Sequence, residues 1–234
     1  GNKPLPVAPD ALEVRLKFDE GTGEVVRNSA PKARTASYTA DTNPLNWGED
    51  SWLWPSARFD MNTRLAMPAE GDFEADQAFS AGTWTMLRLA PANAQTGDGS
   101  LLSRMGGPER NALRGWDLFV EGNKLVVHIV GHWPENAIRV ETAGIPRGQW
   151  IHAGFTYDGS SKAAGVQIYL NGKPVPMTVS NDSLQPGQTI RTDAPLQLGR
   201  RENLQPLRQC RFQDLRVYHR ALSKEEFVRL PFEA

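Results

Sequence analysis

The sequence has a single cysteine, Cys210, among its 234 residues, so no disulfide can form within the chain. A disulfide framework of the kind that stabilises small secreted domains is therefore excluded. A lone cysteine is more often a small buried residue than a reactive thiol, and we expect Cys210 to be buried in a strand.

The chain also lacks an excess of charge of either sign. Lys and Arg number 26 and Asp and Glu number 27, which gives a formal net charge of −1. Proteins that bind nucleic acid or an anionic membrane surface usually carry an excess of Lys and Arg. No apolar stretch is long enough to span a bilayer. The sequence therefore predicts neither a nucleic-acid partner nor a membrane span.

Signatures of catalysis are also scarce. Glucanases with a sandwich fold carry acids as Glu-x-Asp-x-Glu on one strand, so that two carboxylates flank the scissile bond. The acidic cluster that comes nearest to this arrangement, Asp72, Glu74 and Asp76, precedes Phe79 in a predicted loop. No nucleophile elbow, phosphate loop or helical His pair is present. We therefore predict a protein that is not an enzyme.

What the sequence does contain is a series of short alternating apolar segments, separated by Gly, Pro, Asn and Asp, which predicts an antiparallel β protein. In Leu12–Phe18, apolar residues alternate with charged ones, so we expect one buried and one charged face. Ser223 and Glu226 predict the capping box of one short helix. Ala30–Pro68 is predicted as long loops. Further strands are predicted at 63–67, 82–89, 150–157, 166–170, Leu196–Leu198 and Leu215–Val217.

The clearest prediction is a hairpin over 115–130 with Gly122-Asn123 at its turn. This turn places Asp117 directly opposite His128 on one face and Leu118 opposite Val127 on the other, because side chains alternate with a period of two. We expect the Asp117–His128 pair to lie on the exposed face.

This pair is the best candidate for a ligand-binding site. Asp117 and His128 could present donors and acceptors to a sugar or another polar ligand, with Trp133 as a stacking surface. They could equally form an ordinary cross-strand salt bridge, which contributes about 0.2–1 kcal/mol. His152 and Tyr169 either extend the binding face or only follow the amphipathic pattern of their strands. The tryptophans at 47, 52 and 54 could pack a loop or form a second sugar platform.

The second half of the sequence resembles laminin-G-like modules of the concanavalin A-like lectin/glucanase superfamily. The resemblance rests on five blocks in the family's order and on the opening strand at 16–23, with Ala30–Pro68 unmatched. The segments 114–118 and 128–138 are further similar to a variant embedded in large secreted bacterial proteins that also carry cytochrome-c-like domains. The five blocks are 149–160, 166–174, 195–200, 212–218 and 221–226.

The resemblance implies an all-β, two-sheet jelly roll without catalysis of its own, often carbohydrate-binding and often calcium-containing. Calcium prefers six to eight oxygen ligands, and Asp19, Glu20 and Asp214 are its candidate ligands because the family's first and last strands are often neighbours. The alternative for Asp19 and Glu20 is a solvated turn.

We therefore expect residues 1–9 to be a linker and residues 10–234 to form a single sandwich domain. The favoured function is a carbohydrate-binding, lectin-like module within a larger exported bacterial protein, secreted or periplasmic. The alternatives are a structural module that packs against neighbouring domains of its parent chain, and a glycoside hydrolase on the same fold.

Overall fold

The computed structural model describes residues 5–41, 44–48, 55–89, 98–107, 112–202 and 206–233. Its strands form two large antiparallel sheets and one two-stranded sheet, with a single short α-helix near the C-terminal end. The predicted fold class, an all-β sandwich of two sheets, is confirmed.

The first large sheet has eight strands, and its longest strand, β17, pairs with three neighbours. One half of β17 pairs with β5 and the other half with β1, while β7 runs along its opposite edge. The strands of this sheet are, in order, β14 (Lys173–Pro174), β13 (Val166–Leu170), β12 (Trp150–Tyr157), β7 (Phe79–Leu87), β17 (Gln209–Tyr218), β5 (Ser56–Asp60) and β4 (Asn46–Gly48), with β1 (Leu12–Leu16) beside β17.

The second large sheet has seven strands and contains the predicted hairpin at its centre. Its strands are, in order, β15 (Met177–Asp182), β11 (Asn136–Gly144), β10 (Lys124–His132), β9 (Arg114–Glu121), β8 (Gly99–Gly106), β16 (Leu196–Leu198) and β6 (Ala66–Met67).

The remaining elements are small. They are the two-stranded sheet of β2 (Val25–Arg27) and β3 (Ser37–Thr39), the helix α1 (Lys224–Phe227), and the 3₁₀ turns η2 (Ala163–Gly165) and η3 (Leu230–Phe232). None of the helices in the described part of the chain has the length and apolar character needed to span a bilayer.

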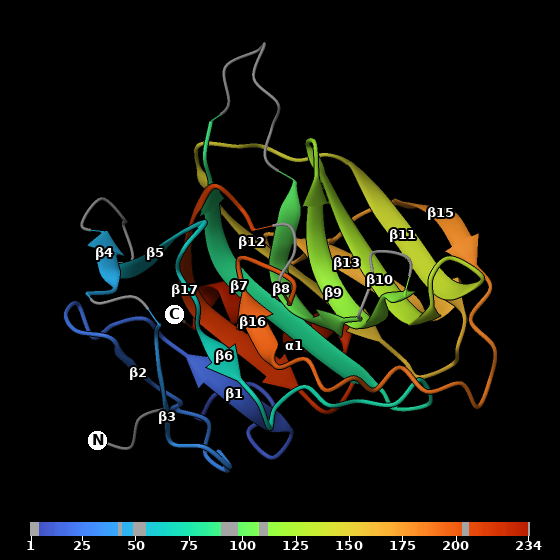
Figure 1. Cartoon of the computed structure of the whole chain (residues 1–234), viewed down its shortest axis with the longest axis horizontal. Helices are drawn as coiled ribbons and strands as arrows, with labels where there is room; N and C mark the ends of the chain where they lie inside the picture. The colour runs from blue at the N-terminus through green and yellow to red at the C-terminus, as the bar shows by residue number, and fades with distance from the viewer. Residues whose placement is uncertain are drawn as a thin grey trace.

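Figure 1 shows the two large sheets packed on each other, with β2 and β3 at one side of the molecule and β11 and β15 at the other. Aromatic rings from both sheets meet between them. Phe79 on β7 lies 5.1 Å from Trp116 on β9 and 5.8 Å from Phe155 on β12, and Phe73 stacks on Phe79 at 4.5 Å. Burial of side chains of this size contributes about 1.5–3 kcal/mol each, so this cluster is a major part of the core.

The segments with strong alternation adopt the predicted strands. The hairpin of β9 and β10 has the predicted register, with Leu118 opposite Val127 and Trp116 opposite Ile129. The strands predicted at 150–157 and 166–170 coincide with β12 and β13. Cys210 is buried on β17, as expected.

Two expectations about the first third of the chain are wrong. Ala30–Pro68 is not only loops before the predicted strand at 63–67, because it also contains β3, β4 and β5; of the predicted strand, Ala66–Met67 is present as β6. The polar face of β1 is not solvated, because Glu13 is 5% exposed and the half-buried Arg15 pairs with Asp214 on β17. The alternation of apolar and charged residues could not show that this face is covered, because the covering residues are distant in the sequence.

The first and last described segments of the chain meet. The Val7 N–H donates a 3.0 Å hydrogen bond to Glu233 Oε2, and Arg15 Nη2 donates a 2.8 Å bond to the Glu233 carbonyl. Together with the pairing of β1 and β17, these contacts join the two ends on one side of the eight-stranded sheet.

Candidate functional site

The polar pair predicted on the hairpin is present. Asp117 and His128 are cross-strand partners, and His128 Nδ1 lies 2.8 Å from Asp117 Oδ1. Leu118 and Val127 are buried behind them in the core, as the period of two requires.

The face that carries this pair is not exposed, so that part of the prediction is wrong. Asp117 is fully buried and His128 is 8% exposed. Arg201, which follows β16, lies over the hairpin: its Nε is 2.7 Å from Asp117 Oδ2, and its guanidinium stands 4.5 Å from the centre of the Phe119 ring. The Ser100 hydroxyl donates a second 2.7 Å hydrogen bond to the same oxygen. The cover comes from a segment more than seventy residues further along the chain.

This network keeps the Asp117 carboxylate ionised. Burial alone would raise its pKa, but the charges and hydrogen bonds of Arg201 and His128 hold the pKa well below its usual range. A carboxylate that stays ionised accepts hydrogen bonds and does not donate a proton. Asp117 is therefore suited to holding Arg201 and His128 in place.

Trp133 lies beside this network, as predicted. Its half-buried ring is 5.5 Å from the His128 ring in an edge-to-face arrangement, and it packs on a small cluster that includes Val130 and Ala137. The peptide bond between Trp133 and Pro134 is cis. The contacts of the indole with His128 and with this cluster hold it just beyond the end of β10.

A polar groove of about 700 Å³ opens at the rim of the seven-stranded sheet. It lies where β8 and β10 end and β9 begins, and Gly131 and His132, which directly precede Trp133, form part of its wall. The charged residues that line it are Asp72, Arg104, Arg114, His132, Arg191 and Asp193. Such a mixture of donors and acceptors suits a polar ligand with many hydroxyl groups.

Arg104 is the most buried of these charged residues. Its side chain is 8% exposed, and its Nη1 donates hydrogen bonds of 2.9 and 2.7 Å to the carbonyls of Pro68 and Glu70. Its Nε has no hydrogen-bond partner in the described part of the chain, although Asp72 Oδ1 lies 3.7 Å away. Arg104 therefore fixes the loop after β6 and retains an unused donor.

The acidic cluster before Phe79 does reproduce the Glu-x-Asp-x-Glu spacing of sandwich glucanases once Glu70 is counted with Asp72 and Glu74. The structure places these residues in an irregular segment between β6 and β7, so they do not share the face of a strand. Glu70 is fully buried, and Asp72 lies within 4 Å of Arg104 and Arg191.

Glu74 has a structural role in this segment. Its carboxylate accepts hydrogen bonds from Thr189 Oγ1 at 2.7 Å and from the Ile190 N–H at 3.2 Å. Partial burial would raise the pKa of Glu74, but these hydrogen bonds lower it below its usual value. The carboxylate thus ties two loops together.

His152 and Tyr169 do not extend this face, contrary to one of the two interpretations of their strands. They lie on β12 and β13 of the other sheet, under α1, where Phe227 stacks on Tyr169 at 4.1 Å and lies 6.0 Å from His152. Burial lowers the pKa of His152 to about 3, so its imidazole is neutral at pH 7. Alternation alone could not show which polar face the C-terminal segment would cover.

The three candidate calcium ligands are not brought together in one cluster. β1 and β17 are neighbours as expected, but Asp214 is bound by Arg15 Nε at 2.9 Å and by Arg216 at 2.5 and 3.0 Å. The Glu20 carboxylate accepts a hydrogen bond from the Arg27 N–H, and Asp19 is exposed. No group of three or more metal-ligating side chains occurs in the described ranges. The calcium prediction thus has no support in the geometry.

The predicted aromatic platform falls partly outside the described residues, because Trp52 and Trp54 lie there. Trp47 on β4 is half-buried and donates a hydrogen bond of 3.0 Å from its indole N–H to the Gly23 carbonyl. For Trp47 the interpretation as a loop anchor is therefore favoured.

Sequence reasoning missed Arg201 and Arg104. The only sign of Arg201 in the sequence was Asp117, because a buried carboxylate requires a positively charged or hydrogen-bonding partner. The order of strands in the sheet would have been needed to identify that partner, because Arg201 reaches Asp117 through the pairing of β16 with β8 and of β8 with β9.

Comparison with known proteins agrees with this architecture. Residues 59–227 match the family model described as the Concanavalin A-like lectin/glucanases superfamily. No curated protein sequence matches the chain.

Solved structures with the same fold include binding domains of clostridial toxins. The binding domain of Paraclostridial Mosquitocidal Protein 1 has a TM-score of 0.66 and 16% identity over 95% of this chain. The binding domain of botulinum neurotoxin DC, solved in complex with rat synaptotagmin II, has a TM-score of 0.64 and 10% identity over 96%. A structure of botulinum neurotoxin type C, whose cell entry depends on interaction with two ganglioside molecules, has a TM-score of 0.65 and 9% identity over 96% of this chain. The chain spans 52% of each of them.

Proposed function

The chain belongs to the Concanavalin A-like lectin/glucanases superfamily, and from this premise we propose that it is a non-catalytic module that binds carbohydrate in the groove beside Trp133. The main observation behind this proposal is the groove itself. Its volume of about 700 Å³ falls in the range of ligand sites, ~300–1,000 Å³, and its wall offers charged donors and acceptors. The half-buried Trp133 directly follows the lining residues Gly131 and His132. Sugars combine polar hydroxyls with an apolar ring face, which suits such a wall.

The absence of catalysis is part of the proposal. Glycoside hydrolysis usually requires two carboxyl groups about 5–9.5 Å apart, one of them with a raised pKa. The pKa of Asp117 is lowered and its carboxylate is buried, and the pKa of Glu74 is also lowered. Asp72 lies within 4 Å of Arg104 and Arg191. These environments suit recognition better than proton transfer.

We also propose that the module belongs to a larger exported bacterial protein, secreted or periplasmic. The support is the similarity of 114–118 and 128–138 to the variant found in such proteins. The toxin structures of the same fold are binding domains about twice as long as this chain. This agrees with a module of a larger chain.

A glycan array followed by calorimetry with the best ligand tests the proposal. We expect Trp133→Ala and Arg191→Gln each to weaken binding about tenfold, equivalent to about 1.4 kcal/mol, because Arg191 lines the groove and Trp133 directly follows its lining residues Gly131 and His132. Arg27→Gln, which removes an exposed charge on β2, is the matched control and should bind like the unaltered protein.

Two results would count against the proposal. Equal affinity of Arg191→Gln, Trp133→Ala and Arg27→Gln would place the ligand elsewhere, and the absence of any glycan ligand would favour a module that packs against its parent's domains. Sugar release that is abolished by Asp72→Asn or Glu74→Gln would replace the binding module with a glycoside hydrolase.

A further inference from the structure

The outer face of the eight-stranded sheet is divided into two halves. The C-terminal segment covers one half, where Phe227 stacks on Tyr169 and the Trp84 indole N–H donates to the Pro231 carbonyl at 3.2 Å. The other half carries a row of directly paired residues that crosses four strands: Trp150 on β12, Met86 on β7, Arg211 on β17 and Arg58 on β5. Adjacent strands are ~4.8 Å apart, so the row is about 15 Å long.

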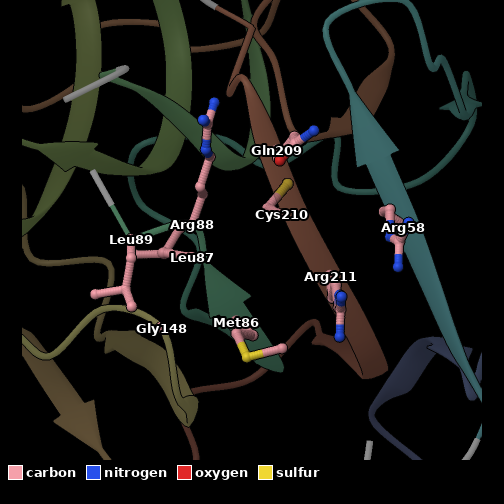
Figure 2. Close-up of a pocket in the computed structure, with 9 residues that line it drawn as sticks. All are labelled: Arg58, Met86, Leu87, Arg88, Leu89, Gly148, Gln209, Cys210 and Arg211. Carbon is pink, nitrogen blue, oxygen red and sulfur yellow. The ribbon is translucent and has the colours of Figure 1, made fainter. Parts of the chain in front are cut away.

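A cavity of about 290 Å³ lies on this second half (Figure 2). Its floor is apolar, with Met86, Leu87 and Leu89, and Leu89 is 67% exposed. Its charged lining consists of the arginines at positions 58, 88 and 211, and no acidic residue of the described chain lines it. The cavity is separate from the groove beside Trp133, which lies on the other sheet.

Figure 2 shows how the three arginines are placed. Arg58 and Arg211 extend from neighbouring strands toward the same side, and the Met86 thioether points toward Arg211. Arg88, just beyond the end of β7, extends in the opposite direction past Gln209. The cationic groups therefore stand at both ends of an apolar floor.

This arrangement favours an anion. Within the described residues, neither Arg58 nor Arg88 makes a side-chain hydrogen bond or ion pair, and Arg58 is half-buried. Like charges directly opposite each other on one face of a sheet repel, so an anion bound between Arg58 and Arg211 gains attraction from both. Guanidinium groups bind carboxylate and sulfate through two parallel hydrogen bonds.

We propose that this cavity binds an acidic saccharide, one whose rings carry carboxylate or sulfate groups. The arginines at its two ends take the anionic groups, and the apolar floor contacts a ring face between them. The volume of about 290 Å³ is at the lower end of ligand sites, which fits a short saccharide segment. The formal net charge of −1 disfavours an extended polyanion such as nucleic acid, which requires a long basic surface.

Calorimetry with three probes of similar length tests this site: an oligogalacturonate, a dextran sulfate oligosaccharide and neutral dextran. We expect at least one acidic probe to bind, more weakly as salt is raised, while neutral dextran does not bind at this site. Arg58→Gln and Arg88→Gln should each weaken binding about tenfold, because each removes one bidentate contact. The probe that binds distinguishes carboxylate from sulfate recognition.

Arg27→Gln is the control for loss of one positive charge, and it should leave the affinity unchanged. Trp133→Ala should also leave it unchanged, which separates this site from the groove. Failure of both acidic probes to bind, or an equal effect of Arg27→Gln and Arg58→Gln, would overturn the proposal. Binding of duplex DNA or phosphatidylserine vesicles that also depends on Arg58 would show a general polyanion site instead of a saccharide site.

Discussion

Asp117 and Arg201 form a buried ion pair at the centre of the seven-stranded sheet, and His128 is hydrogen-bonded to the same carboxylate. Removing one partner of such a pair typically costs ~3–5 kcal/mol, because the other charge stays buried without compensation. We expect Asp117→Asn to lower the free energy of unfolding by about 3 kcal/mol in urea denaturation, since the Arg201 guanidinium would lose its counter-charge.

Glu121→Gln is the matched control on the same sheet. The Glu121 carboxylate is 51% exposed and pairs with Arg139, so its loss should cost less than about 1 kcal/mol. Similar losses for the two variants would show that burial does not strengthen the Asp117 pair.

His152 gives the protein a specific response to acid. Its pKa is lowered to about 3 by burial, whereas an unfolded histidine takes up a proton near pH 6.5. Between these values the unfolded chain binds more protons, so stability falls as the pH falls, by at most ~1.4 kcal/mol per pH unit. In His152→Phe, which removes the titrating group, we expect a shallower pH dependence in urea unfolding at pH 7, 6 and 5.

His132 provides the comparison for this measurement, because its side chain is 59% exposed. His132→Phe should keep the pH dependence of the unaltered protein. If His152→Phe also kept it, the buried imidazole would not be the group that titrates on unfolding.

The helix α1 depends on its first turn. Ser223 Oγ accepts a 3.2 Å hydrogen bond from the Glu226 N–H, and Glu226 Oε2 accepts one of 2.8 Å from the Ser223 N–H. Ser223→Ala should therefore cost about 1 kcal/mol of stability, the usual loss for an N-cap. Thermal melting checks this against Ser160→Ala, an exposed serine outside any helix or strand, which should melt like the unaltered protein. Equal melting temperatures for both variants would refute the capping role.

Elements set by local signals were predictable from the sequence. The register of β9 and β10 follows from Gly122-Asn123 and the alternation on both sides of it, and the cap of α1 follows from Ser223 and Glu226. What covers each sheet was not predictable. Arg201 lies over Asp117, and Phe227 lies over His152 and Tyr169, through contacts between residues far apart in the sequence. The polar groups of these strands therefore looked exposed when they are buried.

The groove was missed for the same reason. Asp72, Arg104 and Arg191 come from three separate segments that meet only when β6, β8 and β16 join one sheet. Residue type alone singled out Trp133, but it could not indicate the arginines that line the groove.

For the whole molecule, the C-terminal segment acts as a cover for the eight-stranded sheet. Phe227 is fully buried, and Glu233 binds Val7 and Arg216. We expect a chain that ends at Leu222 to lose more than about 3 kcal/mol of stability, the usual cost of removing one buried phenylalanine side chain.

Urea unfolding measures that loss, and increased binding of a hydrophobic dye would report the uncovered surface around Trp84 and Tyr169. Phe232→Ala is the control, because this side chain is 83% exposed and should contribute little. A truncated chain as stable as the full one would show that the cover is dispensable.

The contact between the first and last described segments of the chain also affects how the molecule would respond to mechanical force. β1 and β17 are antiparallel, and the pair Leu12–Tyr218 lies where the chain enters β1 and leaves β17. Tension applied between the ends would separate β1 from β17 starting at this residue pair, so the hydrogen bonds between the two strands would break one after another. A shear geometry would load all of them at once. In a single-molecule pulling experiment, we therefore expect the C-terminal segment to detach first and β1 then to separate from β17 at low force, which would leave the rest of the sandwich intact.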